Sequence, residues 1–236
     1  MTLVLVTRPR PEADSTAAAV AALGHRALVE PLLDIRLLPL PGLELDGLQG
    51  VVATSVNGVR ALAGATDVRS LPLYAVGGKT AAMARDAGFA SVVEGGGDAA
   101  SLAGLLARTL DPRAGPLLHV SGADVAADLG ALLAPAGIGV RRVVGYQAVA
   151  AGRLSPDVQL ALAEGRIGAA LFFSPRTART FASLCTIEGV SAACAGLTAL
   201  CLSQAVADGL AGLGWGAVRV AERPTQEALL ALLPPA

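Results

Sequence analysis

An internal duplication is the feature of this sequence that most limits its fold. The segment VVATSVNGVRALAG at 51–64 parallels LFFSPRTARTFASL at 171–184, and each joins an apolar strand to a Ser and, five residues later, an Arg. The segments 74–96 and 200–222 also correspond. In each, a Gly follows the first residue after the expected strand by eleven positions: Gly88 follows Gly77, and Gly214 follows Ser203. Such self-similarity predicts two copies of one strand–helix arrangement.

The order of the repeated segments predicts a domain that is interrupted by another. Residues 3–31 resemble 116–144, so the pieces follow one another as A–B–A′–B′. A Pro-rich stretch at 37–49 separates A from B, and a second linker at 150–156 separates A′ from B′. Four unrelated strand–helix units in a single sheet remain the alternative.

The domain bounds follow from this order. B and A′ would form a continuous domain over 38–149, and A and B′ would form a discontinuous domain over 1–37 plus 150–236. Two linkers joining two halves favour a hinged cleft between them.

Short apolar runs alternate with Ala- and Leu-rich stretches along the whole chain, which is typical of α/β proteins. Strands that are apolar on both faces indicate parallel sheets covered by helices on both sides. Ligands of such sheets bind at the carboxyl ends of the strands. The expected strands are 3–6, 25–30, 50–53, 73–76, 91–93, 116–120, 140–148, 169–173, 197–202 and 217–221. The expected helices are 11–23, 56–63, 79–87, 99–110, 123–133, a short one after 156, 176–184, 204–213 and 225–233.

Composition excludes several classes of protein. Apolar residues make up 53% of the 236 residues but aromatic ones only 3%, so the core must consist of Ala, Leu and Val. The net charge of −1 comes without a basic run, which argues against a nucleic-acid partner. Mean hydropathy is +0.60, yet each apolar stretch is broken well before the ~20 residues that a spanning helix needs. We therefore expect no membrane partner.

The three cysteines indicate a cellular compartment. Cys185, Cys194 and Cys201 are odd in number and lack metal-ligand spacing. We expect buried, reduced thiols in a cytoplasmic protein.

Hydroxyl and glycine residues stand where the expected strands meet the helices. Helix N-termini carry free N–H groups and a partial positive charge, so a ring of such turns can bind a small anionic molecule. Any one of these residues, taken alone, is also explained as an ordinary helix cap. The residues are Thr7, Thr54, Ser55, Gly77, Ser121, Gly122, Ser174 and Ser203.

Other familiar motifs are incomplete. Gly77–Thr80 is similar to the end of a phosphate-binding P-loop, but position 73 is Leu where that motif needs Gly. Gly95–Gly97 is not a dinucleotide fingerprint, and His25 and His119 are isolated, so we expect each to be a surface or packed residue. Neither a metal site nor a Ser–His–Asp triad is predicted.

Tyr146 is one of only two tyrosines, and it lies in VVGYQAV, just before the second linker. This position predicts a phenol near the mouth of the cleft. A packed hinge residue is the alternative interpretation.

Taken together, these motifs resemble the uroporphyrinogen-III synthase family. The resemblance covers nearly the whole chain and rests on VTRP at 6–9, TSVNGVRAL at 54–62, AVGGKTA at 75–81, VVGYQAV, FFSPRTARTF at 172–181 and AERPTQEALLALL at 221–233. It implies two Rossmann-like or flavodoxin-like domains joined by a two-stranded linker. It also implies a cytoplasmic monomer that uses neither cofactor nor metal.

The resemblance further implies the reaction. The substrate would be hydroxymethylbilane, a linear tetrapyrrole with eight carboxylates, and the product uroporphyrinogen III, formed with loss of water and inversion of ring D. Left alone, this substrate closes without inversion, so the enzyme must steer the closure by conformational and electrostatic means.

Site residues follow from the matching positions. Tyr146 would hydrogen-bond the departing hydroxyl as the catalytic residue, and Thr80 and Ser174 would bind the substrate. Some family members have Thr where this chain has Ala205 and Val206, and Ser203 could supply that hydroxyl. Arg60 and Arg176 are further possible carboxylate partners. The remaining expected binding residues are Thr7, Arg8, Ser55, Val56, Gly77, Ser121, Gly122 and Pro175.

Two other functions stay open on the residues alone. One is a non-catalytic two-domain sensor of an anionic small molecule. The other is an enzyme for a different phosphorylated or polycarboxylate metabolite.

Overall fold

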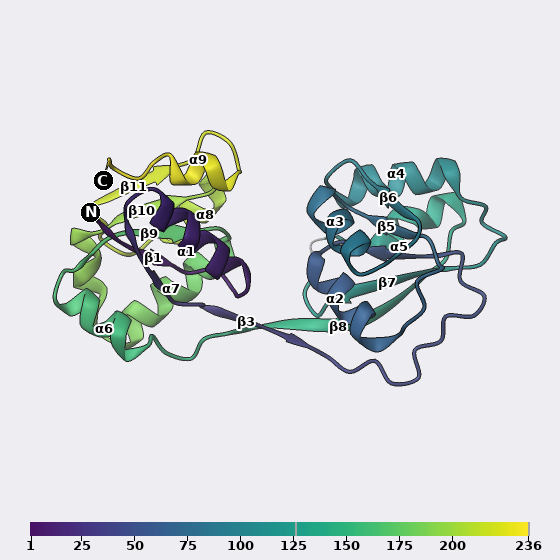
Figure 1. The fold of residues 1–236 in the computed structure, drawn as a ribbon, viewed down its shortest axis with the longest axis horizontal. Coiled ribbons are helices and arrows are strands. Elements are labelled where there is room, and N and C mark those ends of the chain that lie inside the picture. Colours follow the sequence, from purple (N-terminus) through teal and green to yellow (C-terminus); the bar gives the residue numbers. More distant parts are fainter. Residues whose placement is uncertain (126, 236) are drawn as a thin grey trace. The chain divides into compact units, whose positions relative to one another are not determined.

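The chain divides into two compact units (Figure 1). The computed structural model describes residues 1–125 and 127–235. The first unit consists of Met1–Asp34 and the residues from Val149 onward, and the second unit is Ile35–Ala148. The chain passes between them in β3 (Leu33–Leu37) and at the end of β8 (Val140–Ala150). In the described part, no helix combines the length and apolarity needed to cross a bilayer.

The first unit contains a five-stranded parallel sheet in the order β11-β10-β9-β1-β2. Its strand β1 pairs with β2 along the chain and with β9, which lies more than 160 residues further on. The strands are β1 (Leu3–Val6), β2 (Arg26–Val29), β9 (Ile167–Phe172), β10 (Thr198–Cys201) and β11 (Ala217–Val220).

Helices cover both faces of this sheet. Apolar side chains of α6, α7 and α8 form one core cluster with the strands, and those of α1 and α9 form the other. The helices are α1 (Glu12–Ala22), α6 (Pro156–Ala163), α7 (Pro175–Ile187), the 3-10 helix η2 (Ser191–Gly196), α8 (Gln204–Asp208) and α9 (Gln226–Leu230).

The second unit contains a six-stranded sheet in the order β3-β8-β7-β4-β5-β6. The pairs of strands from β8 to β6 are all parallel. Besides β3 and β8, its strands are β4 (Gly50–Ala53), β5 (Leu73–Ala75), β6 (Val92–Glu94) and β7 (Leu117–Gly122).

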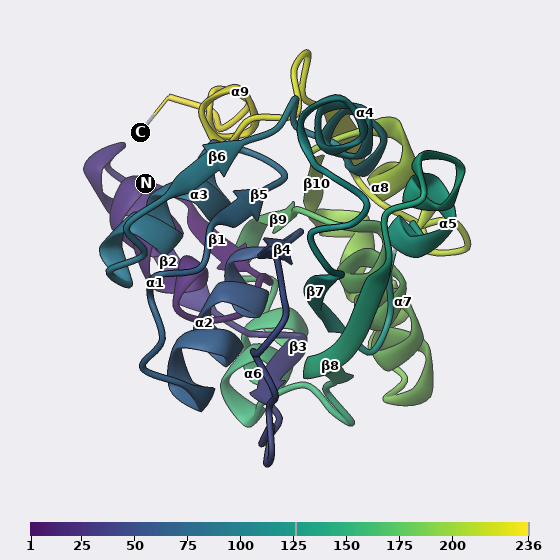
Figure 2. The same cartoon turned by 90° about the vertical axis from the view of Figure 1, so that its right-hand side faces the viewer.

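Two pairs of helices cover the faces of the second sheet (Figure 2). Residues of α2 and α3 pack with Val51, Ala53 and Val120 on one face, and residues of α4 and α5 pack with Val52 and Leu117 on the other. The helices are α2 (Val56–Ala65), α3 (Gly78–Asp86), α4 (Ala99–Thr109), α5 (Leu129–Leu133) and the 3-10 helix η1 (Ala134–Ala136).

The two sheets have equivalent strand orders. Reading β2-β1-β9-β10-β11 beside β8-β7-β4-β5-β6 matches A with A′ and B with B′, as the duplication predicts. The first sheet, numbered along its own strands, has the flavodoxin-like order 2-1-3-4-5. The α/β fold class with two parallel sheets is thus confirmed. In such sheets the ligand crevice lies where the strand order reverses, which is between β7 and β4 in the second unit.

Some element bounds differ from the sequence prediction. β3 is a strand that the sequence analysis did not predict. The expected helix 123–133 begins only at Leu129, where Asp128 caps it, and position 126 of that expectation lies outside the described residues. The expected helix 204–213 ends at Asp208.

Candidate active site

A cavity of about 400 Å³ lies at the carboxyl ends of β4, β5, β7 and β8 in the second unit. It therefore occupies the place in the sheet where parallel α/β proteins bind ligands. Ser55, Gly122 and Tyr146, which the sequence predicted as site residues, line it together with Thr54, which the sequence marked as a strand-end hydroxyl. The other lining residues are Val76, Asp98, Ala99, Asp124, Val125 and Ala127.

The turn after β4 contributes two hydroxyls. Ser55 caps α2, and its Oγ accepts the Asn57 N–H at 3.0 Å. Thr54 precedes it in the cavity wall. Val56 is the first residue of α2 and is half-buried. This turn offers a helix N-terminus, with its partial positive charge, to the cavity.

The turn after β7 supports the tyrosine. A Cβ atom placed on Gly122 would lie 2.9 and 3.0 Å from Cε2 and Cζ of Tyr146, so the phenol ring packs directly on this glycine. The Ala123 N–H donates to the Tyr146 carbonyl at 2.9 Å and fixes the two chain segments together. Within residues 1–125 and 127–235, no hydrogen bond to the Tyr146 hydroxyl is found.

Ser121 does not face the cavity. It is fully buried, and its Oγ accepts the Arg142 Nε–H at 2.8 Å. The same guanidinium donates through Nη2 to the carbonyls of Gly122 at 2.8 Å and Ala123 at 3.0 Å. Arg142 thus clamps the turn that carries Gly122.

Two carboxylate side chains, those of Asp98 and Asp124, line the cavity. Asp98 caps α4 and accepts the Ser101 N–H at 2.7 Å. Hydrogen bonds from Ser101 lower the pKa of Asp98, so this side chain is anionic at neutral pH. Asp124 lies in the same wall.

Gly77 and Thr80 belong to the neighbouring turn, after β5, but neither lines the cavity. Gly77 caps α3 in an extended conformation. Thr80 lies in the first turn of α3 and is only 7% exposed.

Thr7 and Arg8 follow strand β1 of the first unit. Thr7 is fully buried, and its hydroxyl donates to the Leu171 carbonyl at 2.6 Å, so the side chain joins β1 to β9 and does not reach a ligand. The Arg8 Nη1 donates to Gln226 Oε1 at 3.0 Å, and the guanidinium lies 4.2 Å from the centre of the Phe173 ring.

Arg8 is a desolvated cation. Burial lowers its pKa, and the charge of Glu12 raises it in partial compensation. Within the described residues its buried Nε has no hydrogen-bond partner. Because that atom is buried, a carboxylate would bind Arg8 through the terminal nitrogens of the guanidinium, which donate to carboxylates.

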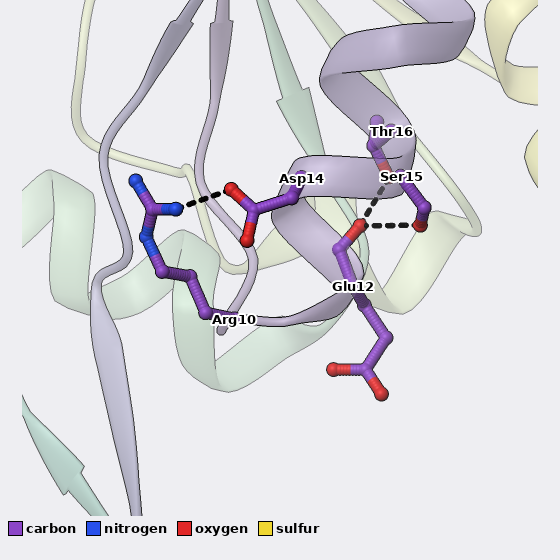
Figure 3. A network of polar contacts seen from close by, with 5 residues as sticks. All are labelled: Arg10, Glu12, Asp14, Ser15 and Thr16. Carbon is purple, nitrogen blue, oxygen red and sulfur yellow. Dashed lines mark hydrogen bonds and ion pairs between the residues drawn. The ribbon is translucent and has the colours of Figure 1, made fainter.

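The first turn of α1 uses its own hydroxyls (Figure 3). The Oγ of Ser15 donates to the Glu12 carbonyl at 2.9 Å, and Thr16 Oγ1 lies 2.9 Å from the same oxygen. Arg10 and Asp14 form an exposed ion pair beside them. These hydroxyls satisfy backbone groups within the helix.

The remaining expected residues of the first unit begin helices. Ser174 caps α7 and accepts the Thr177 N–H at 3.2 Å, and Pro175 is the first helical residue, where a missing N–H costs nothing. Ser203 precedes α8 but makes no side-chain cap.

Sequence reasoning missed Asp98, Asp124 and Val76 as cavity residues, and it counted Thr54 only as a strand-end hydroxyl. The signal for Asp98 was present, because it ends the Gly95–Gly97 loop immediately before a helix. Asp124 carried no local signal.

Two solved structures that resemble this chain are named for the same activity. A uroporphyrinogen-III synthetase from Helicobacter pylori is 20% identical, with 98% of each chain covered and a TM-score of 0.67. A mutant uroporphyrinogen III synthase from the extremely thermophilic bacterium Thermus thermophilus is 21% identical, with 98% of this chain and 97% of that chain covered and a TM-score of 0.53. At these identities the likeness shows the fold. Among curated protein sequences no significant match is found.

The family assignment comes from the sequence itself. Residues 14–231 match the family described as uroporphyrinogen-III synthase HemD, and that span includes every residue of the cavity wall. This chain therefore belongs to the uroporphyrinogen-III synthase family.

Proposed function

We propose that the strand ends of both units bind hydroxymethylbilane and that Tyr146 acts at its reacting end. The chain is a lyase of tetrapyrrole biosynthesis that cyclises this substrate to uroporphyrinogen III with loss of water and inversion of ring D. What we propose is which residues of this chain bind the substrate and assist its cyclisation. The observation that carries it is the common cavity of Tyr146, Ser55 and Gly122.

The phenol is suited to assist the first step. An ordinary phenol, with a pKa near ~10, is neutral at pH 7 and can donate a hydrogen bond. We infer that Tyr146 transfers its phenol proton to the hydroxyl of the substrate as the C–O bond breaks, so that water leaves and a phenolate and an azafulvene cation remain. The substituted carbon of ring D attacks this cation to give a spiro intermediate, and the phenolate recovers a proton when the final macrocycle loses one.

The carboxylates of the cavity suit that cation. Asp98 and Asp124 line the same wall as Tyr146, and the anionic Asp98, held by its hydrogen bond from Ser101, would stabilise positive charge that develops during the reaction. The cavity therefore has a donor for the departing hydroxyl and negative charge for the group left behind.

Binding of the eight substrate carboxylates needs many moderate contacts. In the second unit the candidates are the α2 N-terminus with Ser55 and Val56, the turn at Gly122, and α3 with Gly77 and Thr80. In the first unit they are Arg8, α7 with Ser174 and Pro175, and Ser203. Thr7 and Ser121 would contribute only through their backbone, because their side chains are buried.

The proposal includes one substrate shared by two domains, 1–37 plus 150–236 and 38–149, in a common cleft. We further propose a cytoplasmic monomer that works without cofactor or metal, and the three buried free thiols suit a reducing compartment.

The isomer of the product tests this function. Freshly prepared hydroxymethylbilane is incubated with the protein, and the uroporphyrinogens are oxidised and resolved as type I and type III. We expect predominantly type III, whereas the reaction without protein gives type I. Predominantly type I product in the presence of folded protein would reject the synthase function.

A further inference from the structure

A histidine lies directly behind the cavity wall of the second unit. His119 in β7 is only 2% exposed, and its Nε2 is 3.3 Å from Oγ1 of Thr54, which lines the cavity. In the sequence this histidine is isolated, without metal-ligand spacing. The ring connects the interior of the sheet to a hydroxyl at the candidate site.

The register of three parallel strands brings this pair together. Val52 in β4 pairs with His119, and His119 pairs with Arg142 in β8. Side chains two residues further along a strand lie on the same face, so Thr54 follows Val52 and Ser121 follows His119. Thr54 and His119 therefore share a face with the Arg142 clamp.

Burial, more than the nearby charges, keeps the ring neutral. Burial lowers the pKa of His119 from 6.5 to about 4, and the cation of Arg142 contributes to this lowering, whereas Asp128 at the start of α5 opposes the shift. A neutral imidazole has one donor and one acceptor nitrogen. Its Nε2 can therefore either accept from Thr54 or donate to it.

The choice between these two hydrogen bonds decides what Thr54 offers to the cavity. If the Thr54 hydroxyl donates to the ring, only its lone pairs face the ligand, and they repel a carboxylate. If the ring donates to Thr54, the hydroxyl hydrogen is free to point into the cavity. The second arrangement suits a substrate that carries eight carboxylates.

We propose that His119 is a positioning residue, whose Nε2–H donates to Thr54 Oγ1 and thereby directs the Thr54 hydroxyl hydrogen toward a carboxylate of the bound substrate. This inference rests on the proposed function. It adds a substrate contact at Thr54 and a residue that acts through it without touching the substrate.

A double-mutant cycle separates positioning from a structural role. Thr54→Val removes the hydroxyl and keeps the shape, and His119→Leu removes the ring donor. Each is expected to lower kcat/KM about five- to tenfold, mainly through a higher KM, which is the effect of one lost hydrogen bond. The double variant should be no worse than Thr54→Val alone. Fully additive losses would show that His119 does not act through Thr54.

Conservative variants keep this test informative if His119→Leu folds poorly. His119→Gln places an amide donor near Nε2, and Thr54→Ser keeps the hydroxyl, so each should retain most of the wild-type kcat/KM. Losses as large as those of His119→Leu and Thr54→Val would overturn the proposal.

Imidazole ¹⁵N NMR tests the hydrogen bond without any activity. His25 is the internal reference, because its Nδ1 accepts the Thr2 N–H at 3.3 Å. We expect His119 to be neutral and protonated at Nε2 between about pH 5.5 and 8, and Thr54→Val to shift its signals but not those of His25. A bare Nε2, or a His119 that titrates near pH 6.5, would overturn the proposed donor.

The two readouts distinguish this inference from the proposed function. Type I product from the wild type would overturn the proposed function and, with it, the substrate contact at Thr54. Type III product from the wild type together with a bare Nε2 would overturn the role of His119 alone.

Discussion

Gly122 shows how one missing side chain fixes a reacting group. The Tyr146 ring occupies the space that a Cβ at this position would need, with two ring carbons at 2.9 and 3.0 Å from that point. Contacts this short cannot be absorbed without moving either the ring or the turn, and the turn is held by Arg142. The position of the phenol ring therefore depends on the missing side chain of Gly122.

Gly122→Ala is accordingly expected to displace the Tyr146 ring and to lower kcat about tenfold or more while the protein stays folded. The reason is that moving a catalytic group by about 1 Å can lower the reaction rate by that factor or more. Steady-state kinetics on hydroxymethylbilane measure the effect. Gly64→Ala is the control, because a Cβ there meets no atom within 4 Å, and its activity should not change. Equal activity of both variants would show that the ring position is unimportant.

Removal of the phenol hydroxyl tests the catalytic assignment. Tyr146→Phe keeps the ring on Gly122 but leaves no donor for the departing hydroxyl, so we expect turnover to fall about 100-fold, at the lower end of general-acid effects. Tyr74→Phe, at the other tyrosine of the chain, is the control and should keep its turnover. Unchanged turnover of Tyr146→Phe would remove this residue from the mechanism.

His119 makes stability depend on pH. Its folded pKa of about 4 lies below the unfolded 6.5, so the unfolded chain binds the proton more tightly. The contribution of the neutral His119 to the free energy of unfolding is fully present above pH 6.5 and is lost as the pH falls toward 4. This loss amounts to at most about 3 kcal/mol. Unfolding of the wild type and His119→Gln should therefore differ in pH dependence between about pH 4 and 6.5. Parallel pH profiles would contradict a neutral His119 in the folded state.

At the scale of elements, two serines that look alike in sequence differ in what they stabilise. Ser174 accepts the Thr177 N–H and begins the 13-residue helix α7, whereas Ser203 begins the five-residue α8 without a side-chain cap. The equivalent place of the two residues before their helices does not give them equal roles.

Ser174→Ala is expected to lower the free energy of unfolding by about 1 kcal/mol, because the cap hydrogen bond is lost. Ser203→Ala should change it by less than about half of that. Denaturant unfolding measures both, and equal losses would contradict the assignment of caps. Each variant should lose only part of its activity, because substrate binding is spread over many groups.

Elements with a strong local pattern could be predicted from the sequence, and those set by distant partners could not. The apolar strands β1, β4 and β9 follow from continuous buried runs. β3 is a short edge strand whose partner β8 begins more than 100 residues later, so nothing local marks it. The helix α8 stops early because Gly209 and Gly212 lie in its expected C-terminal half.

The candidate site also contains residues that could be predicted from the sequence and residues that could not. Ser55 and Gly122 were predictable because strand ends and turn residues are visible in sequence. The contact of His119 with Thr54 was not, because it depends on the register between β4 and β7, which are more than 60 residues apart. The burial of the Thr7 and Ser121 hydroxyls was hidden for the same reason.

At the scale of the whole molecule, each unit has its own core. The clusters that cover the second sheet draw all their buried residues from 48–138, whereas those of the first sheet combine residues before 33 with residues after 153. Both units are therefore self-sufficient in apolar contacts, but only the second consists of one continuous stretch of chain.

The fragment 35–148 is accordingly expected to fold alone, with a cooperative thermal transition and dispersed NMR amide signals. It should not convert hydroxymethylbilane to the type III isomer, because the donors of the first unit are missing. A fragment that remains unfolded would contradict an independent core, and one that makes type III product would contradict the shared substrate.

The pairing of β1 with β9 has a consequence for biosynthesis. During translation, the amino-terminal strand emerges first but cannot enter a completed sheet until residue 172 and its successors leave the ribosome, by which time 35–148 has been fully synthesised. The nascent chain thus carries the segment β1–α1–β2 without its partner strand β9, although the whole second unit has already been synthesised. Until β9 is synthesised, the apolar faces of β1 and α1 stay exposed, and this is the stage at which the chain is most prone to aggregate.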